Sequence, residues 1–144
     1  MAKLISARTA QPVMEAEFTF NFDDTMVPTA GVERDFGKVN VAETAVDIIN
    51  LPPRAVVLGG EVVTDTAFDA ATYNITVGDA DSAARYLGTT DRKATGRTAL
   101  VPTGFRGTGK PIRLTFTAAD VCTAGKMTVR VQYITEGRGI DVNP

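Results

Sequence analysis

The stretch from Lys126 to Ile134, K-M-T-V-R-V-Q-Y-I, constrains the fold of this chain more than any other. Apolar and polar side chains alternate along it, and branched or aromatic residues occupy the apolar positions, which is typical of a β-strand. The side chains that share the apolar face are Met127, Val129, Val131 and Tyr133. Burying each of them contributes roughly 1.5–3 kcal/mol relative to exposure. One strand cannot bury its own face, so the rest of the chain must supply neighbouring strands and a second layer.

Other segments show strand-like patterns and are separated by turns rich in glycine, proline and aspartate. They are residues 15–22, 44–51, 54–68, 72–77, 98–101 and 112–117. In the first of them Phe18, Phe20 and Phe22 share one face, which makes that face a main part of the predicted core. Seven to eight short strands predict an all-β fold, an antiparallel β-sandwich or barrel. The long early connection and the uneven strand spacing favour a jelly roll over a simple meander.

Two local features leave their structure open. Gly59-Gly60 lies in the middle of the 54–68 segment, and it fits either a tight hairpin turn or a bulge in one long strand. We favour the bulge, because one bent strand could then serve two sheets. Residues 79–87, D-A-D-S-A-A-R-Y-L, are the only segment with a plausible helical pattern, of two turns at most. Asp79 or Asp81 would cap that helix.

The chain is expected to form a single β-sandwich domain, residues 1–144, with an N-terminal arm (1–13) and a polar C-terminal tail (137–144). The arm fits either a frayed terminus or a segment that packs against a neighbouring subunit. Residues 23–39 form a long irregular connection, and such loops are usually functional or held by a partner. The candidate partner-contacting residues in these two segments are Lys3, Leu4, Ile5, Arg8, Arg34 and Phe36.

Composition narrows the classes of function. The formal charge of −2 comes from 15 basic and 17 acidic residues with no basic stripe, which argues against nucleic acid as a partner. The chain has no histidine and one cysteine, Cys122, so an ordinary catalytic triad, a cysteine-based zinc cluster and an intramolecular disulfide are excluded. No apolar run approaches the ~20 residues of a membrane span, and the N-terminal apolar stretch is too short for a secretory signal. We therefore expect synthesis in the cytoplasm and no membrane partner.

Two motifs resemble ligand-binding loops, but each lacks residues that such a loop requires. Residues 104–111, G-F-R-G-T-G-K-P, fit a phosphate-binding loop until its last position, where Pro111 replaces the required Ser or Thr and a strand follows in place of a helix. A glycine-rich hairpin loop explains this segment better. Asp79 and Asp81 lack the glycine and the glutamate of a calcium loop, so helix capping or solvated turn carboxylates explain them better. We expect no enzyme activity, no metal and no cofactor.

Four segments together resemble a known family. They are R-A-V-V-L-G-G-E-V-V-T-D-T-A-F (54–68), Y-N-I-T-V-G-D (73–79), R-Y-L (85–87) and G-R-T-A-L-V-P-T-G (96–104), followed by the strand V-R-V-Q-Y-I. This pattern resembles the small cement or decoration proteins of tailed-bacteriophage capsids, over about residues 54–136. The resemblance rests on a patterned core rather than on a chemical signature.

The resemblance implies a jelly-roll-like fold, no catalysis and a location on the capsid exterior, after synthesis in the bacterial host cytoplasm. It also implies that the major capsid protein is the partner, bound across joints between its subunits, and that the protein is a homo-oligomer, a dimer or trimer. The alternative is a receptor- or carbohydrate-binding β-sandwich of a phage head fibre. Aromatic residues make up only 7% of the chain, tryptophan is absent, and most aromatic residues fall on predicted inward faces, which weighs against that alternative.

Overall fold

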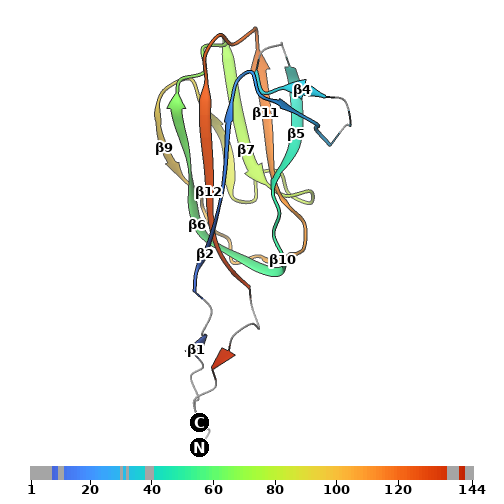
Figure 1. Cartoon of the computed structure of the whole chain (residues 1–144), viewed down its shortest axis with the longest axis vertical. Coiled ribbons are helices and arrows are strands. Elements are labelled where there is room, and N and C mark those ends of the chain that lie inside the picture. The colour runs from blue at the N-terminus through green and yellow to red at the C-terminus, as the bar shows by residue number, and fades with distance from the viewer. Residues whose placement is uncertain are drawn as a thin grey trace, which may run out of the picture.

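The computed structural model describes residues 8–9, 12–29, 31, 33–37, 41–135 and 140–141, which form two packed antiparallel β-sheets (Figure 1). The five-stranded sheet contains β2 (Met14–Asn21), β12 (Lys126–Thr135), β6 (Pro53–Thr66), β9 (Gly96–Ala99) and β10 (Arg106–Thr108). The four-stranded sheet contains β5 (Val41–Ile49), β11 (Ile112–Ala119), β7 (Thr72–Gly78) and β8 (Leu87–Asp91). Two short pairs join β3 (Thr25–Met26) to β4 (Arg34–Asp35), and β1 (Arg8–Thr9) to β13 (Ile140–Asp141).

The pairing of the eight longest strands is that of a jelly roll. Taken in chain order, the first pairs with the last (β2 with β12), the second with the seventh (β5 with β11), the third with the sixth (β6 with β9), and the fourth with the fifth (β7 with β8). A long hairpin rolled into two sheets produces this nesting. The predicted antiparallel, jelly-roll-like sandwich is therefore confirmed.

The strand predicted over residues 126–134 is β12, and it lies between β6 and β2 in the five-stranded sheet. Met127, Val129 and Val131 are fully buried on its inner face, as the alternation predicts. Phe20 on β2 is also buried, while Phe18 and Phe22 are half-buried and pack against the core. β2 is an edge strand, so its inner face is covered less completely than that of β12.

Aromatic rings join the two sheets through the middle of the core. Phe20 of β2 stacks on Phe36 with 4.0 Å between ring centres, and Phe68 stacks on Tyr73 of β7 at 3.9 Å. The Tyr73 hydroxyl donates a hydrogen bond to the backbone carbonyl of Phe36, and burial raises the pKa of this hydroxyl. The Cys122 N–H donates to the carbonyl of the neighbouring Gly37. The segment around Phe36 is thus anchored inside the sandwich.

The Gly59-Gly60 pair lies within one continuous strand and not in a hairpin turn, and a bulge lies directly before the pair rather than at it. Gln132 pairs with Gly59 and Tyr133 pairs with Val57, so Leu58 is the extra residue on β6. The reason given for the bulge was wrong, because β6 belongs to a single sheet. The outer edge of β6 is instead shared by two short strands, β10 near its start and β9 near its end.

The predicted helix over residues 79–87 is wrong. Asp79 does accept hydrogen bonds from the N–H groups of Asp81 and Ser82, as a cap would, but the segment forms turns. The Tyr86 N–H donates to the carbonyl of Val77, which returns the chain to the sheet, and β8 begins at the next residue. The segment therefore forms a tight connection between β7 and β8 instead of a helix.

The predicted hairpin loop over residues 104–111 is also wrong. Arg106–Thr108 form β10, which pairs with the start of β6 in the five-stranded sheet. The next strand, β11, begins at Ile112 in the other sheet. The glycine-rich segment is therefore a crossover between the sheets that carries a short edge strand.

Candidate interaction surface

The part of the chain that the structure describes contains no candidate metal centre. No group of three or more histidine, cysteine, aspartate or glutamate side chains there could hold a metal ion. The Cys122 thiol is buried, and burial raises its pKa, so it lacks the thiolate character of a reactive cysteine. Among the described residues no helix has the length and hydrophobicity to span a membrane. The candidate functional features are therefore surfaces.

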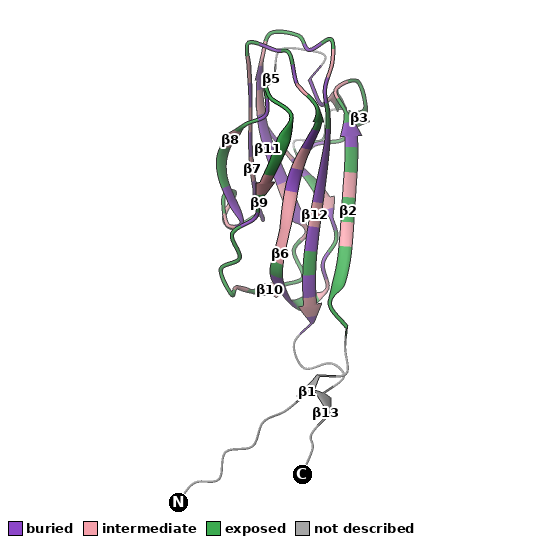
Figure 2. Ribbon diagram, turned by 90° about the vertical axis from the view of Figure 1, so that its left-hand side faces the viewer, coloured by how far each residue is buried: buried purple, intermediate pink, exposed green. Residues whose placement is uncertain are grey.

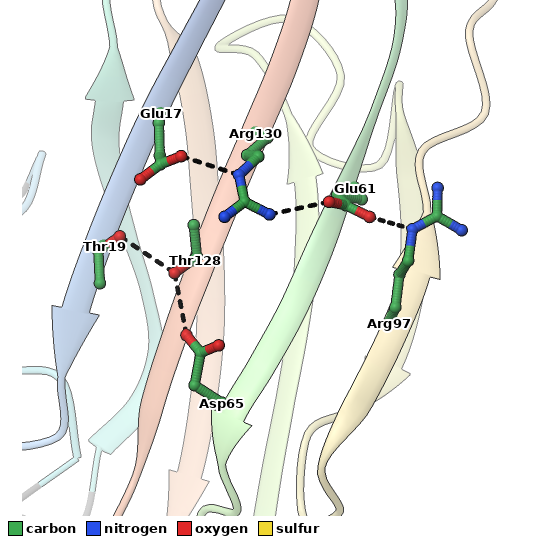
Figure 3. A network of polar contacts seen from close by, with 7 residues as sticks. All are labelled: Glu17, Thr19, Glu61, Asp65, Arg97, Thr128 and Arg130. Atoms are coloured by element: carbon green, nitrogen blue, oxygen red, sulfur yellow. Dashed lines mark hydrogen bonds and ion pairs between the residues drawn. The ribbon is translucent and has the colours of Figure 1, made fainter.

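The outer face of the five-stranded sheet carries a row of alternating charges (Figure 3). Glu17 on β2 accepts a hydrogen bond from Arg130 on β12 at 2.8 Å, and Arg130 donates at 2.9 Å to Glu61 on β6. Glu61 in turn pairs with Arg97 on β9. Hydrogen bonds from Arg97 and Arg130 lower the pKa of Glu61, while Glu17 and Glu61 raise the pKa of Arg130. The row has no net charge, and its inner members are satisfied by one another.

A second polar chain runs beside this row. The hydroxyls of Thr19 and Thr128 are 3.0 Å apart, and Thr128 donates to Asp65 at 3.0 Å (Figure 3). Both chains connect β2, β12 and β6 side by side, and the ion-paired row continues to β9. Cross-strand pairs of this kind stabilise a sheet. We interpret this face as a stabilising feature rather than a binding site, because a ligand would have to replace hydrogen bonds and ion pairs that already exist within the sheet.

The β2 edge is different, since its outward backbone groups have no strand partner among the described residues. β2 lies at the margin of the sandwich next to β3 (Figure 2). The Phe22 N–H donates to the Gly125 carbonyl beside β12, and backbone direction alternates along an antiparallel strand, so Glu15, Glu17, Thr19 and Asn21 direct their N–H and C=O groups away from β12. Those of Asn21 are occupied by Asp24.

An open groove lies between β2 and β5, where the two sheets separate at this margin. Its lining is mixed: four of the lining residues are polar, Thr19, Asp24, Thr25 and Asp47, and the others are apolar. The residues that form the apolar part are Phe18, Phe20, Met26, Val27, Phe36 and Val46. Phe18 and Met26 are only half-buried, and 63% of Val27 is exposed. The groove therefore exposes three apolar side chains among polar ones, beside a strand edge that has no strand partner among the described residues.

The segments that form this margin of the sandwich are rich in acidic residues, and Asp24 and Asp47 line the groove itself. The described residues from 12 to 49 include one basic side chain, Arg34, and these carboxylates: Glu15, Glu17, Asp23, Asp24, Glu33, Asp35, Glu43 and Asp47. Within the described ranges only two of them form ion pairs with arginine, Glu17 with Arg130 and Asp47 with Arg113 at 2.9 Å. The β2–β5 margin is thus negatively charged, although the net charge of the whole chain is only −2.

Of the residues predicted to contact a partner, the structure describes Arg8, Arg34 and Phe36. Lys3, Leu4 and Ile5 lie outside the described residues. Arg8 belongs to β1 and pairs with Asp141 of β13, so this part of the arm pairs with the chain's own tail. Arg34 is exposed in β4, close to the groove, whereas Phe36 is 1% exposed and its ring is part of the core.

Sequence reasoning missed the groove residues Met26 and Val27. They follow the Asp23-Asp24 turn in what reads as an irregular connection, without any alternation of their own. Two apolar residues in a connection of mixed apolar, acidic and basic composition are a weak signal. The groove itself depends on β2 and β5 being edge strands on the same side of the sandwich, which no local pattern shows.

Comparison with known proteins gives structural matches alone, since no family profile and no curated protein sequence matches the chain. A chain in the capsid asymmetric unit of cyanophage Pam1 is 22% identical with a TM-score of 0.56, over 89% of this chain and 93% of that one. A chain in the acid-stable capsid of Helicobacter pylori bacteriophage KHP30 is 15% identical with a TM-score of 0.64, over 98% and 99%. A chain in the capsid of Ralstonia phage GP4 is 9% identical with a TM-score of 0.51, over 94% and 91%.

The chain shares its fold with chains of phage capsids. The matches cover nearly all of both partners, so the likeness extends to the whole sandwich rather than to a shared sheet. At these identities the likeness concerns the fold.

Proposed function

We propose that this chain is a structural virion protein that binds the exterior of a phage capsid and stabilises it by bridging major capsid protein subunits. The observation that carries the proposal is the match to a chain of the KHP30 capsid, which covers 98% of this chain and 99% of that one. Two further capsid structures hold chains with the same fold. We further propose that the protein acts as a homo-oligomer, a dimer or trimer.

The physical properties of the sandwich support this role. Its core is a continuous cluster that includes stacked rings, and its outer sheet is reinforced by ion pairs, so it forms a rigid body. A cement protein needs such a body and a surface that binds its neighbours, and it needs no reactive centre. Many copies on one shell act together, so contacts that are weak individually hold the lattice strongly.

Carbohydrate or receptor binding is the competing function. Sugar sites commonly present exposed aromatic platforms. Among the described residues the exposed large apolar side chains are Val13, Met14, Val27, Leu58, Val101 and Val121, and none is aromatic. The Phe105 ring is covered by the Arg85 guanidinium, 3.5 Å from the ring centre. These observations favour the capsid role.

The direct test is co-sedimentation of the purified protein with expanded capsids that lack it, followed by imaging of the particles. We expect saturable binding, added density on the outer surface at joints between major capsid subunits, and a higher temperature of capsid disruption. A protein that stays in the supernatant would refute the proposal. Binding to a glycan array without binding to capsids would instead support the head-fibre alternative.

A further inference from the structure

We infer that the groove between β2 and β5 receives an extended segment of a neighbouring capsid chain, which adds as a strand to the β2 edge and alternates basic with apolar residues. The inference rests on the proposed function, because it takes the segment to belong to a capsid subunit. It specifies which surface makes the contact and which chemistry the segment has.

The backbone of β2 is prepared for such an addition. Glu15, Glu17 and Thr19 direct N–H and C=O groups to the open side, and no strand of the described chain takes them. An extended peptide that pairs with these groups would extend the five-stranded sheet by one strand. Strand addition of this kind provides affinity through main-chain hydrogen bonds and specificity through alternate side chains. The opposite open edge of the same sheet is divided between β9 and β10, which are four and three residues long.

The apolar residues of the groove explain why every second side chain of the added segment would be apolar. A strand added beside β2 would direct every second side chain to the inner face, beside Phe18 and Met26, which the sandwich leaves half-covered. Val27 at one end of the groove is 63% exposed. Apolar side chains of the added strand would remove this surface from water.

The negative charge of the β2–β5 margin explains why the remaining side chains of the added segment would be basic. Side chains directed outward from an added strand would lie beside Glu15 and Glu17, the polar face of β2. Opposite charges directly across a strand pair stabilise it, and like charges destabilise it. Lysine or arginine at these positions therefore completes the contact, and Asp24 in the groove lining adds to the negative potential.

The same charges argue against a second copy of this chain as the occupant. Two β2 strands pairing about a two-fold axis would bring Glu15 and Glu17 of both copies to the same face of one sheet. Such an arrangement places four carboxylates close together with only the two Arg130 side chains to offset them. A basic segment from a different chain meets no such repulsion.

The test compares four single variants in capsid co-sedimentation. Glu15→Pro removes one outward N–H at a position where no described bond within the sandwich is lost, and Glu15→Gln removes only the charge. Val27→Asp places a carboxylate in the groove. Val101→Asp is its matched control, because Val101 is 64% exposed and lies outside the groove. Circular dichroism and thermal unfolding establish that each variant is folded.

We expect Glu15→Pro and Val27→Asp to weaken capsid binding by about tenfold or more, a loss of about 1.4 kcal/mol. Glu15→Gln should weaken binding by a few-fold, and this difference should shrink at high salt because screening weakens the charge contact. Val101→Asp should bind as the wild type does. If folded Glu15→Pro and Val27→Asp proteins bind normally, the inference is wrong while the proposed function stands.

Two other outcomes also decide the matter. If the wild-type protein itself fails to bind capsids, the proposed function fails first. If the wild-type protein is an oligomer in solution and Glu15→Pro converts it to monomers, the edge is occupied by a second copy, and the inferred capsid segment is wrong.

Discussion

Gly60 of β6 lies directly against the main chain of Arg130 in β12, so that a Cβ atom on Gly60 would be 2.2 Å from the Arg130 carbonyl oxygen. Gly60 also has a positive φ of 147°. The neighbouring Gly59 has room, since its nearest atom would be a flexible side-chain oxygen of Gln132 at 3.5 Å. The close pairing of β6 with β12 beside the bulge therefore requires glycine at position 60 and tolerates a side chain at position 59.

Gly60→Ala should destabilise the protein by about 2 kcal/mol or more, because a strained backbone and a clash with main-chain atoms act together. Gly59→Ala, the matched control, should change the free energy of unfolding by less than about 1 kcal/mol. Urea unfolding of the two variants measures the difference. Equal stability of the two proteins would contradict the close approach of Gly60 to the main chain of Arg130.

Tyr73→Phe should destabilise the protein by about 1–3 kcal/mol, because it leaves the buried carbonyl of Phe36 without its hydrogen bond. Tyr133→Phe is the control, since the Tyr133 ring is also largely buried while its hydroxyl donates to none of the described residues. Thermal and urea unfolding report the effect. A Tyr73→Phe protein as stable as the control would show that this bond does not anchor the Phe36 segment.

Asp79→Asn should reduce stability near neutral pH by about 1–3 kcal/mol, because Asp79 accepts a 2.7 Å hydrogen bond from Arg85 in a nearly buried pair. Burial alone would raise the pKa of Asp79, but the bonds from Arg85, Ser82 and Asp81 outweigh it and lower the pKa below 3.8. A lowered folded-state pKa stabilises the protein above the unfolded-state value, and this stabilisation is lost as the pH falls through the folded-state value.

The stability difference between wild type and Asp79→Asn should therefore be constant from neutral pH down to about pH 5 and shrink in more acidic solution. Asp81→Asn is the control, since its pair with Lys110 is about half exposed and contributes at most about 1 kcal/mol. Urea unfolding at a series of pH values measures both differences. A difference for Asp79→Asn that grows as the pH falls would contradict the assigned charge state.

Deletion of residues 1–12 should leave a folded β-sandwich that binds capsids poorly. Folding should survive because β2 begins at Met14 and the buried core residues lie between Phe20 and Tyr133. Circular dichroism tests the first expectation and co-sedimentation with capsids tests the second. Unchanged capsid retention of the truncated protein would remove the arm from the proposed binding mode and leave the β2 edge as the contact.

Local alternation identified the long strands because each of them buries one face. The pattern at Met127, Val129 and Val131 was sufficient to place β12 at the centre of a sheet. The same reasoning missed β8 and β10, which are short and lie at sheet edges, where little alternation is needed. It also assigned a helix to residues 79–87, because cap residues and small side chains suit a tight connection as well as a helical turn.

The candidate surface depended on information that is not local. Phe36 lies in a stretch that reads as a loop, and its burial follows from contacts with Phe20 and Tyr73. The groove exists because β2 and β5, which belong to different sheets, are both edge strands on the same side of the sandwich. The sequence does contain the acidic character of this margin, but charges in a loop become a binding surface only when the topology places them beside an open strand.

The nesting of the first and last long strands also determines how the sandwich responds to mechanical load. Met14 pairs with Tyr133, so the chain enters β2 and leaves β12 at the same pole (Figure 1). Tension between these two ends would unzip β2 from β12 one residue pair at a time, beginning at that pole, instead of shearing all the pairs together. The sandwich should therefore unfold at low force when it is pulled by its own two ends. A pull on β6 and β12 from opposite poles would instead have to break all the hydrogen bonds between these strands together, which requires a higher force.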